Sequence, residues 1–121
     1  MQNFSVLMSL YYKEKPEYAR ACFESLLAQT VQADEWVIVE DGPLTGELYA
    51  LLDEYEAKCP GLIHRVPLKE NVGLGKALRE GVTHCQNELI ARMDTPGHRS
   101  RRHSWENRSR DSSRSHYSRV P

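Results

Sequence analysis

The chain has 121 residues, which is enough for one domain with a small hydrophobic core. Its net charge of −1 hides an asymmetry, because residues 1–95 carry 9 basic and 15 acidic side chains, whereas residues 96–121 carry 7 basic and 2 acidic ones. The three cysteines (Cys22, Cys59 and Cys85) lack metal-ligand spacing, which argues against a disulfide scaffold or a zinc module, and no stretch approaches the roughly 20 apolar residues of a membrane span.

Apolar runs of strand length alternate with segments of helical periodicity along the first 93 residues. Residues 4–10 are largely apolar and have the length of a buried strand, and Pro16 then opens a helix over residues 16–29. The remaining elements follow in the order strand, helix, strand, helix, strand, over residues 36–39, 45–58, 62–66, 73–85 and 88–93.

This alternation predicts an α/β fold with a Rossmann-like sheet of four parallel strands and helices on both faces. Right-handed crossovers favour the strand order 3-2-1-4. The fourth strand then has an exposed outer edge, so we expect either marginal stability or self-association through that edge. Ligands of such sheets bind beyond the carboxyl ends of the strands, so the residues that directly follow strands are candidates for function.

Polar or flexible residues occupy these positions. Asp41 follows the second strand, where a carboxylate can accept a hydrogen bond from a nucleobase or a ribose, although Asp-Gly-Pro is also ordinary turn chemistry. Gly73, Gly75 and Lys76 open the third helix, where backbone N–H groups favour anions, although glycines also start helices without any ligand. Asp94 ends the fourth strand, and a single carboxylate there is a weak sign of a metal site.

Five segments in order resemble the family 2 glycosyltransferases, which have the GT-A fold. Residues 5–12 are similar to the family's first strand and nucleobase-facing loop, and residues 24–30 to its E-S-(I/L)-x-x-Q-T segment. Residues 39–43 are similar to its V-(D/E)-D-G-(S/P) turn. Residues 71–81 are similar to its N-x-G-x-(G/A)-x-A-x-N-x-G helix start, with arginine in place of the usual second asparagine, and residues 90–95 to the approach to its D-x-D motif.

The resemblance implies an inverting glycosyltransferase, most similar to bacterial exopolysaccharide and capsule enzymes. Such an enzyme takes a nucleotide-sugar donor, usually a UDP-sugar, and a glycan or lipid-linked acceptor. By the resemblance, Asp41 holds the nucleobase, and Gly73, Gly75 and Lys76 lie near the base or the diphosphate. Asp94 is the first D-x-D carboxylate, close to the ribose and to the divalent metal, Mn²⁺ or Mg²⁺, of the intact enzyme.

The family pattern stops at Thr95. The second D-x-D carboxylate belongs at position 96, where Pro96 offers no metal ligand. The acceptor-binding half and the catalytic base lie further downstream in the family, so no catalytic residue is assigned. We therefore expect residues 1–95 to be a truncated nucleotide-sugar-binding region that does not hold the metal firmly and does not catalyse transfer.

Residues 96–121 are rich in arginine and serine and show neither helical nor strand periodicity, which predicts a disordered tail. The abrupt change after Thr95 favours a shift of reading frame or a cloning artefact as its origin. A functional basic segment that contacts nucleic acid phosphates or an anionic membrane is the alternative. Because residues 1–95 are acidic, we do not expect a nucleic acid partner.

Two other functions stay open: a non-catalytic nucleotide-binding module, and a nucleic-acid-binding protein with an Arg/Ser tail. Residues 1–4 lack the basic start of a signal peptide, so we expect a cytoplasmic location. Peripheral attachment to the inner face of the cytoplasmic membrane is compatible with that expectation.

Overall fold

The computed structural model describes residues 3–93, 103–107 and 118–120. Strands and helices alternate along residues 5–93 as the sequence predicts. The strands are β1 (Ser5–Leu10), β2 (Glu35–Glu40), β3 (Ile63–Pro67) and β4 (Leu89–Met93), and the helices are α1 (Pro16–Leu27), α2 (Gly46–Lys58) and α3 (Leu74–Val82). Helix α3 ends three residues earlier than expected, because residues 83–85 continue as tighter turns with hydrogen bonds to the third preceding carbonyl.

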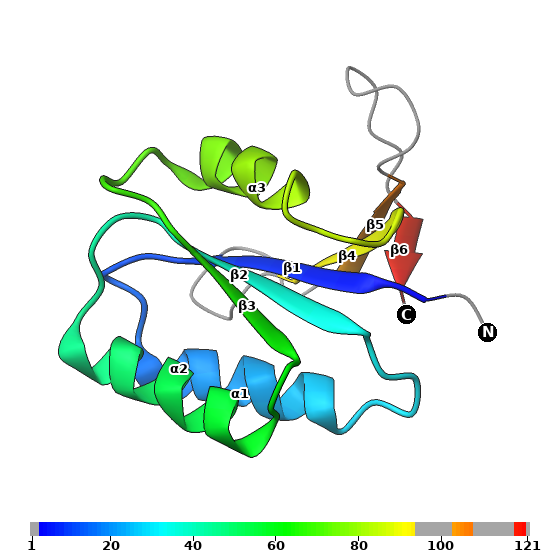
Figure 1. Ribbon diagram of the computed structural model, residues 1–121, viewed down its shortest axis with the longest axis horizontal. Coiled ribbons are helices and arrows are strands. Elements are labelled where there is room, and N and C mark those ends of the chain that lie inside the picture. The colour runs from blue at the N-terminus through cyan, green and yellow to red at the C-terminus, as the bar shows by residue number, and fades with distance from the viewer. Residues whose placement is uncertain (1–2, 94–102, 108–117, 121) are drawn as a thin grey trace.

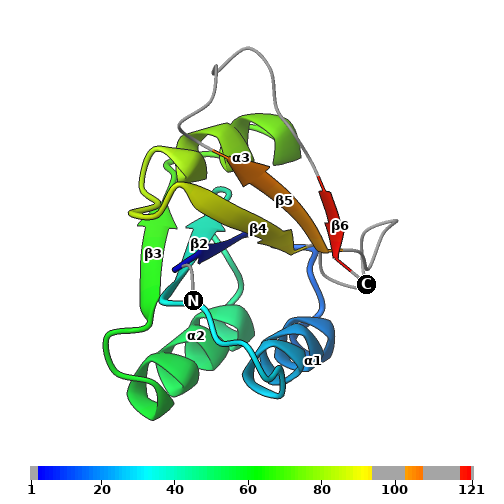
Figure 2. The same cartoon turned by 90° about the vertical axis from the view of Figure 1, so that its right-hand side faces the viewer.

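The first four strands form a parallel sheet in the predicted order β3-β2-β1-β4. Figure 2 shows β3 next to β2, with β4 in front of them. Strand β1 is central, with Ser5 opposite Glu35 of β2 on one side and opposite Ile90 of β4 on the other. The α/β fold class is therefore confirmed. Because the four strands are parallel, their carboxyl ends share one edge of the sheet.

The outer edge of β4 differs from the expectation. Strand β5 (His103–Asn107) pairs antiparallel with β4, and β6 (Ser118–Val120) pairs antiparallel with β5. The outer edge of β4, on which the expected self-association rested, is therefore paired with β5. Residues 103–107 and 118–120, which the sequence predicts to be disordered, are strands. The physical reason is that unpaired N–H and C=O groups along an edge accept any extended backbone, whatever its side-chain period. The other residues of 96–121 lie outside the described ranges.

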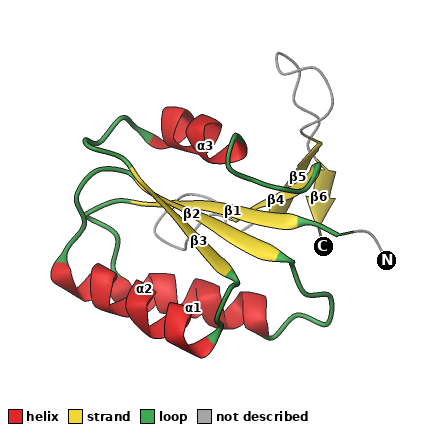
Figure 3. Ribbon diagram, viewed as in Figure 1, coloured by secondary structure: helices red, strands yellow, loops and turns green. Residues whose placement is uncertain are grey.

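Two layers of helices enclose the parallel strands. Helices α1 and α2 cover one face of the sheet and α3 covers the other (Figure 1; Figure 3). Successive residues of β1 serve opposite faces, so Met8 packs in the core under α1 and α2, whereas Leu7 packs in the core under α3. Both faces of the sheet are buried, which explains why Val6, Leu7 and Met8 of β1 are apolar in succession rather than alternating with polar residues.

Helix α3 lies unusually close to the sheet at Gly81. A Cβ atom on Gly81 would stand 2.4 Å from Leu7 Cδ1 and 2.7 Å from Val39 Cγ2. Both of these side chains are fully buried, so neither has free space into which it could move. The closing glycine of the 71–81 motif is therefore explained by packing.

We predict that Gly81→Ala lowers the free energy of unfolding by about 1–3 kcal/mol, the usual cost of overpacking a core. Urea denaturation measures this change. Gly75→Ala is the matched control, since a Cβ on Gly75 would meet no atom within 4 Å and alanine favours a helix. Equal effects of the two substitutions would contradict the packing explanation.

Tyr55 joins α1 to α2. Its buried ring packs edge-on against Phe23 with the ring centroids 5.0 Å apart, and its hydroxyl donates a hydrogen bond to Glu24. Burial raises the pKa of Tyr55, and the hydrogen bond to Glu24 raises it further. The folded chain therefore favours the neutral phenol.

We predict that Tyr55→Phe costs about 1 kcal/mol of stability at pH 8, through the lost hydrogen bond. Because the pKa is raised on folding, the contribution of Tyr55 is complete below the unfolded pKa of about 10 and is lost as the pH rises through the folded value. The gap between wild type and variant should thus shrink between pH 8 and pH 11, as measured by urea denaturation. Tyr18→Phe, at an exposed tyrosine, is the control, and a gap that stays constant would refute the assignment.

Candidate functional site

Asp41 directly follows β2 at the carboxyl edge of the sheet, and only 3% of its surface is exposed. Its carboxylate accepts two backbone hydrogen bonds from the loop that precedes α3. The Val72 N–H donates to Oδ1 at 2.7 Å, and the Gly73 N–H donates to Oδ2 at 3.1 Å. Hydrogen bonds of this kind to a charged acceptor are among the stronger ones in proteins.

The backbone around Asp41 supports the same contact. The Asp41 N–H donates to the carbonyl of Leu10 at 2.8 Å, which aligns the ends of β1 and β2. Gly42 has a φ of +85°, and a Cβ at this position would lie 2.7 Å from the backbone nitrogen of Asn71. The Asn71 side chain also donates to the carbonyl of Asp41 at 3.3 Å. Only glycine fits at position 42, both for its conformation and for this close approach.

The structure therefore brings two of the predicted motifs together. Gly73 is the N-cap of α3, with a φ of +95°, and its N–H is bound by the protein's own carboxylate. Gly75 and Lys76 are exposed in the first turn of α3. An anion at this helix start would have to use N–H groups beyond that of Gly73, together with the Lys76 ammonium.

Asp94 lies outside the described residues, so its predicted metal role stays a prediction. Strand β4 ends one residue earlier, at Met93, and runs parallel to β1 toward the same edge. Within residues 3–93, 103–107 and 118–120, no three His, Cys, Asp or Glu side chains are grouped so that they could hold a metal ion. The described residues alone therefore do not fit a metal centre.

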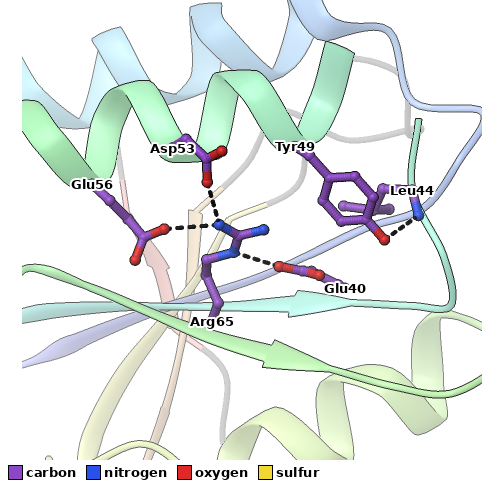
Figure 4. Close-up of polar contacts among 6 residues, drawn as sticks. All are labelled: Glu40, Leu44, Tyr49, Asp53, Glu56 and Arg65. Carbon is purple, nitrogen blue, oxygen red and sulfur yellow. Dashed lines mark hydrogen bonds and ion pairs between the residues drawn. The ribbon is translucent and has the colours of Figure 1, made fainter. Parts of the chain in front are cut away.

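Arg65 carries an ion cluster that sequence reasoning missed (Figure 4). Its guanidinium Nε donates to Glu40 at 2.5 Å, and its Nη1 donates to Asp53 and to Glu56 at 2.8 Å each. Burial alone would lower the pKa of Arg65, but the hydrogen bonds to the three carboxylates outweigh burial and raise it above its usual value. The cluster thus ties α2 to β2 and β3, on the opposite face from α3.

The only sequence signal for this cluster was an arginine within a short strand, with two acidic residues one helical turn apart on α2. The partner on β2, Glu40, is buried and directly precedes Asp41. The last residue of β2 and the residue after it therefore connect the sheet to α2 and to α3 respectively.

Two adjacent tyrosines, of which Tyr12 is exposed and Tyr11 half-buried, lie in the loop after β1. Tyr12 is 52% exposed, and its ring meets that of Tyr11 edge-on with the centroids 6.0 Å apart. The Lys13 ammonium is 5.8 Å from the centroid of the Tyr12 ring. An exposed ring beside a cation, at the edge where Asp41 lies, offers a surface on which a base can stack.

A second buried polar cluster lies at the opposite, amino-terminal edge. Ser5 donates to the buried carboxylate of Glu35 at 2.6 Å, which also accepts the Gln86 N–H, and the Asn87 side chain donates to Ser5 at 3.1 Å. These contacts join β1 and β2 to the loop before β4. Their hydrogen bonds are internal to the chain, so we assign them a structural role.

Comparison with known proteins adds family information to this geometry. Residues 5–95 match the family model described as Glycosyl transferase family 2. An uncharacterized glycosyltransferase of Haemophilus influenzae is 55% identical over 93 residues, and the amylovoran biosynthesis glycosyltransferase AmsE of Erwinia amylovora is 51% identical over 92. These matches cover 77% and 76% of the chain, and 34% of each relative.

A third relative has a named substrate. The UDP-Gal:α-D-GlcNAc-diphosphoundecaprenol β-1,3-galactosyltransferase of Escherichia coli is 36% identical over 93 residues, which are 77% of the chain and 33% of that protein. The chain thus spans about a third of the length of the curated relatives that it matches.

Solved structures share the fold. The mannosyltransferase PcManGT of Pyrobaculum calidifontis, in complex with GDP-Man and Mn²⁺, aligns with a TM-score of 0.66 at 20% identity, over 76% of the chain and 27% of that protein. GalNAc-T7 with UDP, GalNAc and Mn²⁺ aligns with a TM-score of 0.68 at 21% identity, over 76% and 17%. At this level of identity the likeness shows the GT-A fold alone.

None of the helices within residues 3–93 is long and apolar enough to cross a membrane.

We predict that Arg65→Ala lowers the free energy of unfolding by about 2–3 kcal/mol, because it leaves the buried Glu40 carboxylate without its charged partner. Urea denaturation measures this loss. Arg20→Ala is the control, since it breaks an ion pair with Glu54 in which the side chains are 47% and 42% exposed, and it should cost clearly less. A loss at Arg65 no larger than at Arg20 would contradict the anchoring role.

Proposed function

Because this chain belongs to glycosyl transferase family 2, we propose that it derives from an enzyme that transfers a sugar from a nucleotide donor, a UDP-sugar, to a glycan or lipid-linked acceptor. Residues 1–95 are the region that binds the donor nucleotide. Two relatives support the choice of substrates: one is named for UDP-Gal and a diphosphoundecaprenol acceptor, and another for biosynthesis of the polysaccharide amylovoran. We propose cell-surface polysaccharide synthesis as the process to which this transfer belongs.

One observation carries the proposal. The Asp41 turn and the start of α3, which are far apart in sequence, meet at the carboxyl edge of the parallel sheet through two hydrogen bonds. This is the edge at which parallel α/β sheets bind their ligands. Asp41, Tyr12 and Lys76 therefore lie on segments that meet at one edge of the sheet.

The roles of the individual residues follow from their chemistry. Asp41 supplies an acceptor for a base N–H, and Tyr12 a ring for the base. Lys76 and the helix start with Gly73 and Gly75 face the negative charge of the diphosphate. Asp94 is proposed as the residue next to the ribose and the divalent metal, a cation that two structural neighbours bind as Mn²⁺.

We further propose that the chain as given does not turn over a sugar. Pro96 occupies the position at which the family has its second acidic metal ligand, and proline offers no side-chain donor atom. On this proposal residues 1–95 form the donor-binding region, and residues 96–121, which include β5 and β6, arose by a shift of reading frame. A role at the inner face of the membrane, where a lipid-linked acceptor lies, belongs to the intact enzyme.

We predict that UDP binds weakly to the full chain and more tightly than GDP, as measured by isothermal titration calorimetry with and without Mn²⁺. Lys76→Met should weaken UDP about two- to fivefold, the loss of one exposed ion pair, and leave uridine unchanged. Lys58→Met, on α2, is the matched control.

Three outcomes would contradict parts of the proposal. Equal affinity for UDP and GDP would contradict the proposal that the donor is a UDP-sugar. Failure of every nucleotide to bind would remove the donor site. Release of sugar from a UDP-sugar by this chain would overturn the statement that it does not catalyse.

A further inference from the structure

Residues 69–76 connect β3 to the first turn of α3, and every side chain in this stretch is exposed. The hydrophobic core therefore does not hold this loop. Its backbone is held instead by contacts with the turn after β2, above all by the two N–H groups that donate to Asp41. We propose that Asp41 is a positioning residue: its buried carboxylate fixes residues 71–73, and so fixes the start of α3 that carries Lys76.

The burial of Asp41 makes this contact strong. A carboxylate that is 3% exposed has lost almost all of its hydration, and that loss must be offset by hydrogen-bond donors within the protein. Val72 and Gly73 supply one donor to each oxygen. Asp41 also lies at the amino-terminal end of α3, where the helix dipole favours a negative charge.

Steric fit adds to the hydrogen bonds. A Cβ on Gly42 would lie within 3.2 Å of backbone atoms of residues 70 and 71, so the turn and the loop can approach this closely only with glycine at position 42. The Asn71 side chain closes the contact by donating to the Asp41 carbonyl. The loop thus has one preferred position before any ligand arrives.

Positioning differs from direct recognition of a base. If Asp41 served only as a base ligand, replacing it would weaken nucleotide binding and leave the free loop unchanged. If Asp41 positions the loop, the change appears at Val72 and Gly73 in the nucleotide-free chain. The part of this proposal that concerns UDP rests on the proposed function, whereas the part that concerns the loop does not.

The first test is amide hydrogen exchange by NMR in Asp41→Asn, in the full nucleotide-free chain. Asparagine keeps the size of aspartate but replaces one acceptor oxygen with a donor, so exchange at Val72 and Gly73 should accelerate about tenfold or more. Asp34→Asn, at an exposed aspartate at the other end of β2, is the matched control and should change neither amide. Unchanged exchange at both amides in Asp41→Asn would overturn the proposal.

If Asp41→Asn does not fold, the hydrogen bonds to Asp41 are measured directly in the wild-type chain. Coupling across the hydrogen bonds, from the amide nitrogens of Val72 and Gly73 to the side-chain carboxyl carbon of Asp41, is expected in a long-range triple-resonance spectrum. Absence of both couplings would overturn the proposal.

The second test asks whether Asp41 acts through the start of α3. Asp41→Asn and Lys76→Met, each of which should weaken UDP, are combined, and UDP affinity is measured by calorimetry. If Asp41 positions Lys76, the double variant binds UDP no more weakly than Asp41→Asn alone. Fully additive losses would overturn this link. Absence of UDP binding in the wild type would refute the proposed function. The positioning of residues 71–73 by Asp41 would then be tested by amide exchange alone.

Discussion

The carboxylate of Asp41 has almost no contact with water, so it depends on hydrogen-bond donors from its own chain. This requirement determines how the segments at the carboxyl edge of the sheet are placed. Asp41 takes its two donors from the loop before α3, so the position of the helix follows from the position of the strand end. Gly42 permits the approach and Gly81 lets the same helix lie flat against the sheet at its other end. The contacts that shape the carboxyl edge of the sheet are therefore internal to the chain.

Glu40, which precedes Asp41, makes a corresponding contact on the other face of the sheet. Glu40 points to the opposite face, where Arg65 links it to α2, so consecutive residues at the end of β2 secure one helix on each face. Alternation of side chains along a strand makes this division natural. Displacement of the end of β2 would disturb both helical layers, which explains why an acidic pair followed by glycine stands at this point of the chain.

Periodicity predicted the sheet and its strand order, because buried parallel strands are short apolar runs and right-handed crossovers leave few topologies. It did not predict the partners of Asp41 or Arg65, since these contacts join residues far apart in sequence through polar groups that carry no period. It also missed β5, because backbone pairing at an edge needs no hydrophobic pattern. The roles of Asp94 and Pro96 stay predictions, as both lie outside the described residues.

The central place of β1 has a consequence for how the chain reaches its fold. Strand β1 precedes the other described strands and helices in the chain, yet one of its neighbours, β4, comes after every other parallel strand and helix. The half formed by β1, β2, β3 and their two connecting helices can assemble early, with one side of β1 still unpaired. Contacts of such high sequence separation form slowly. During that interval β1 would be a hydrophobic edge open to other chains, and the arrival of β4 ends this exposure.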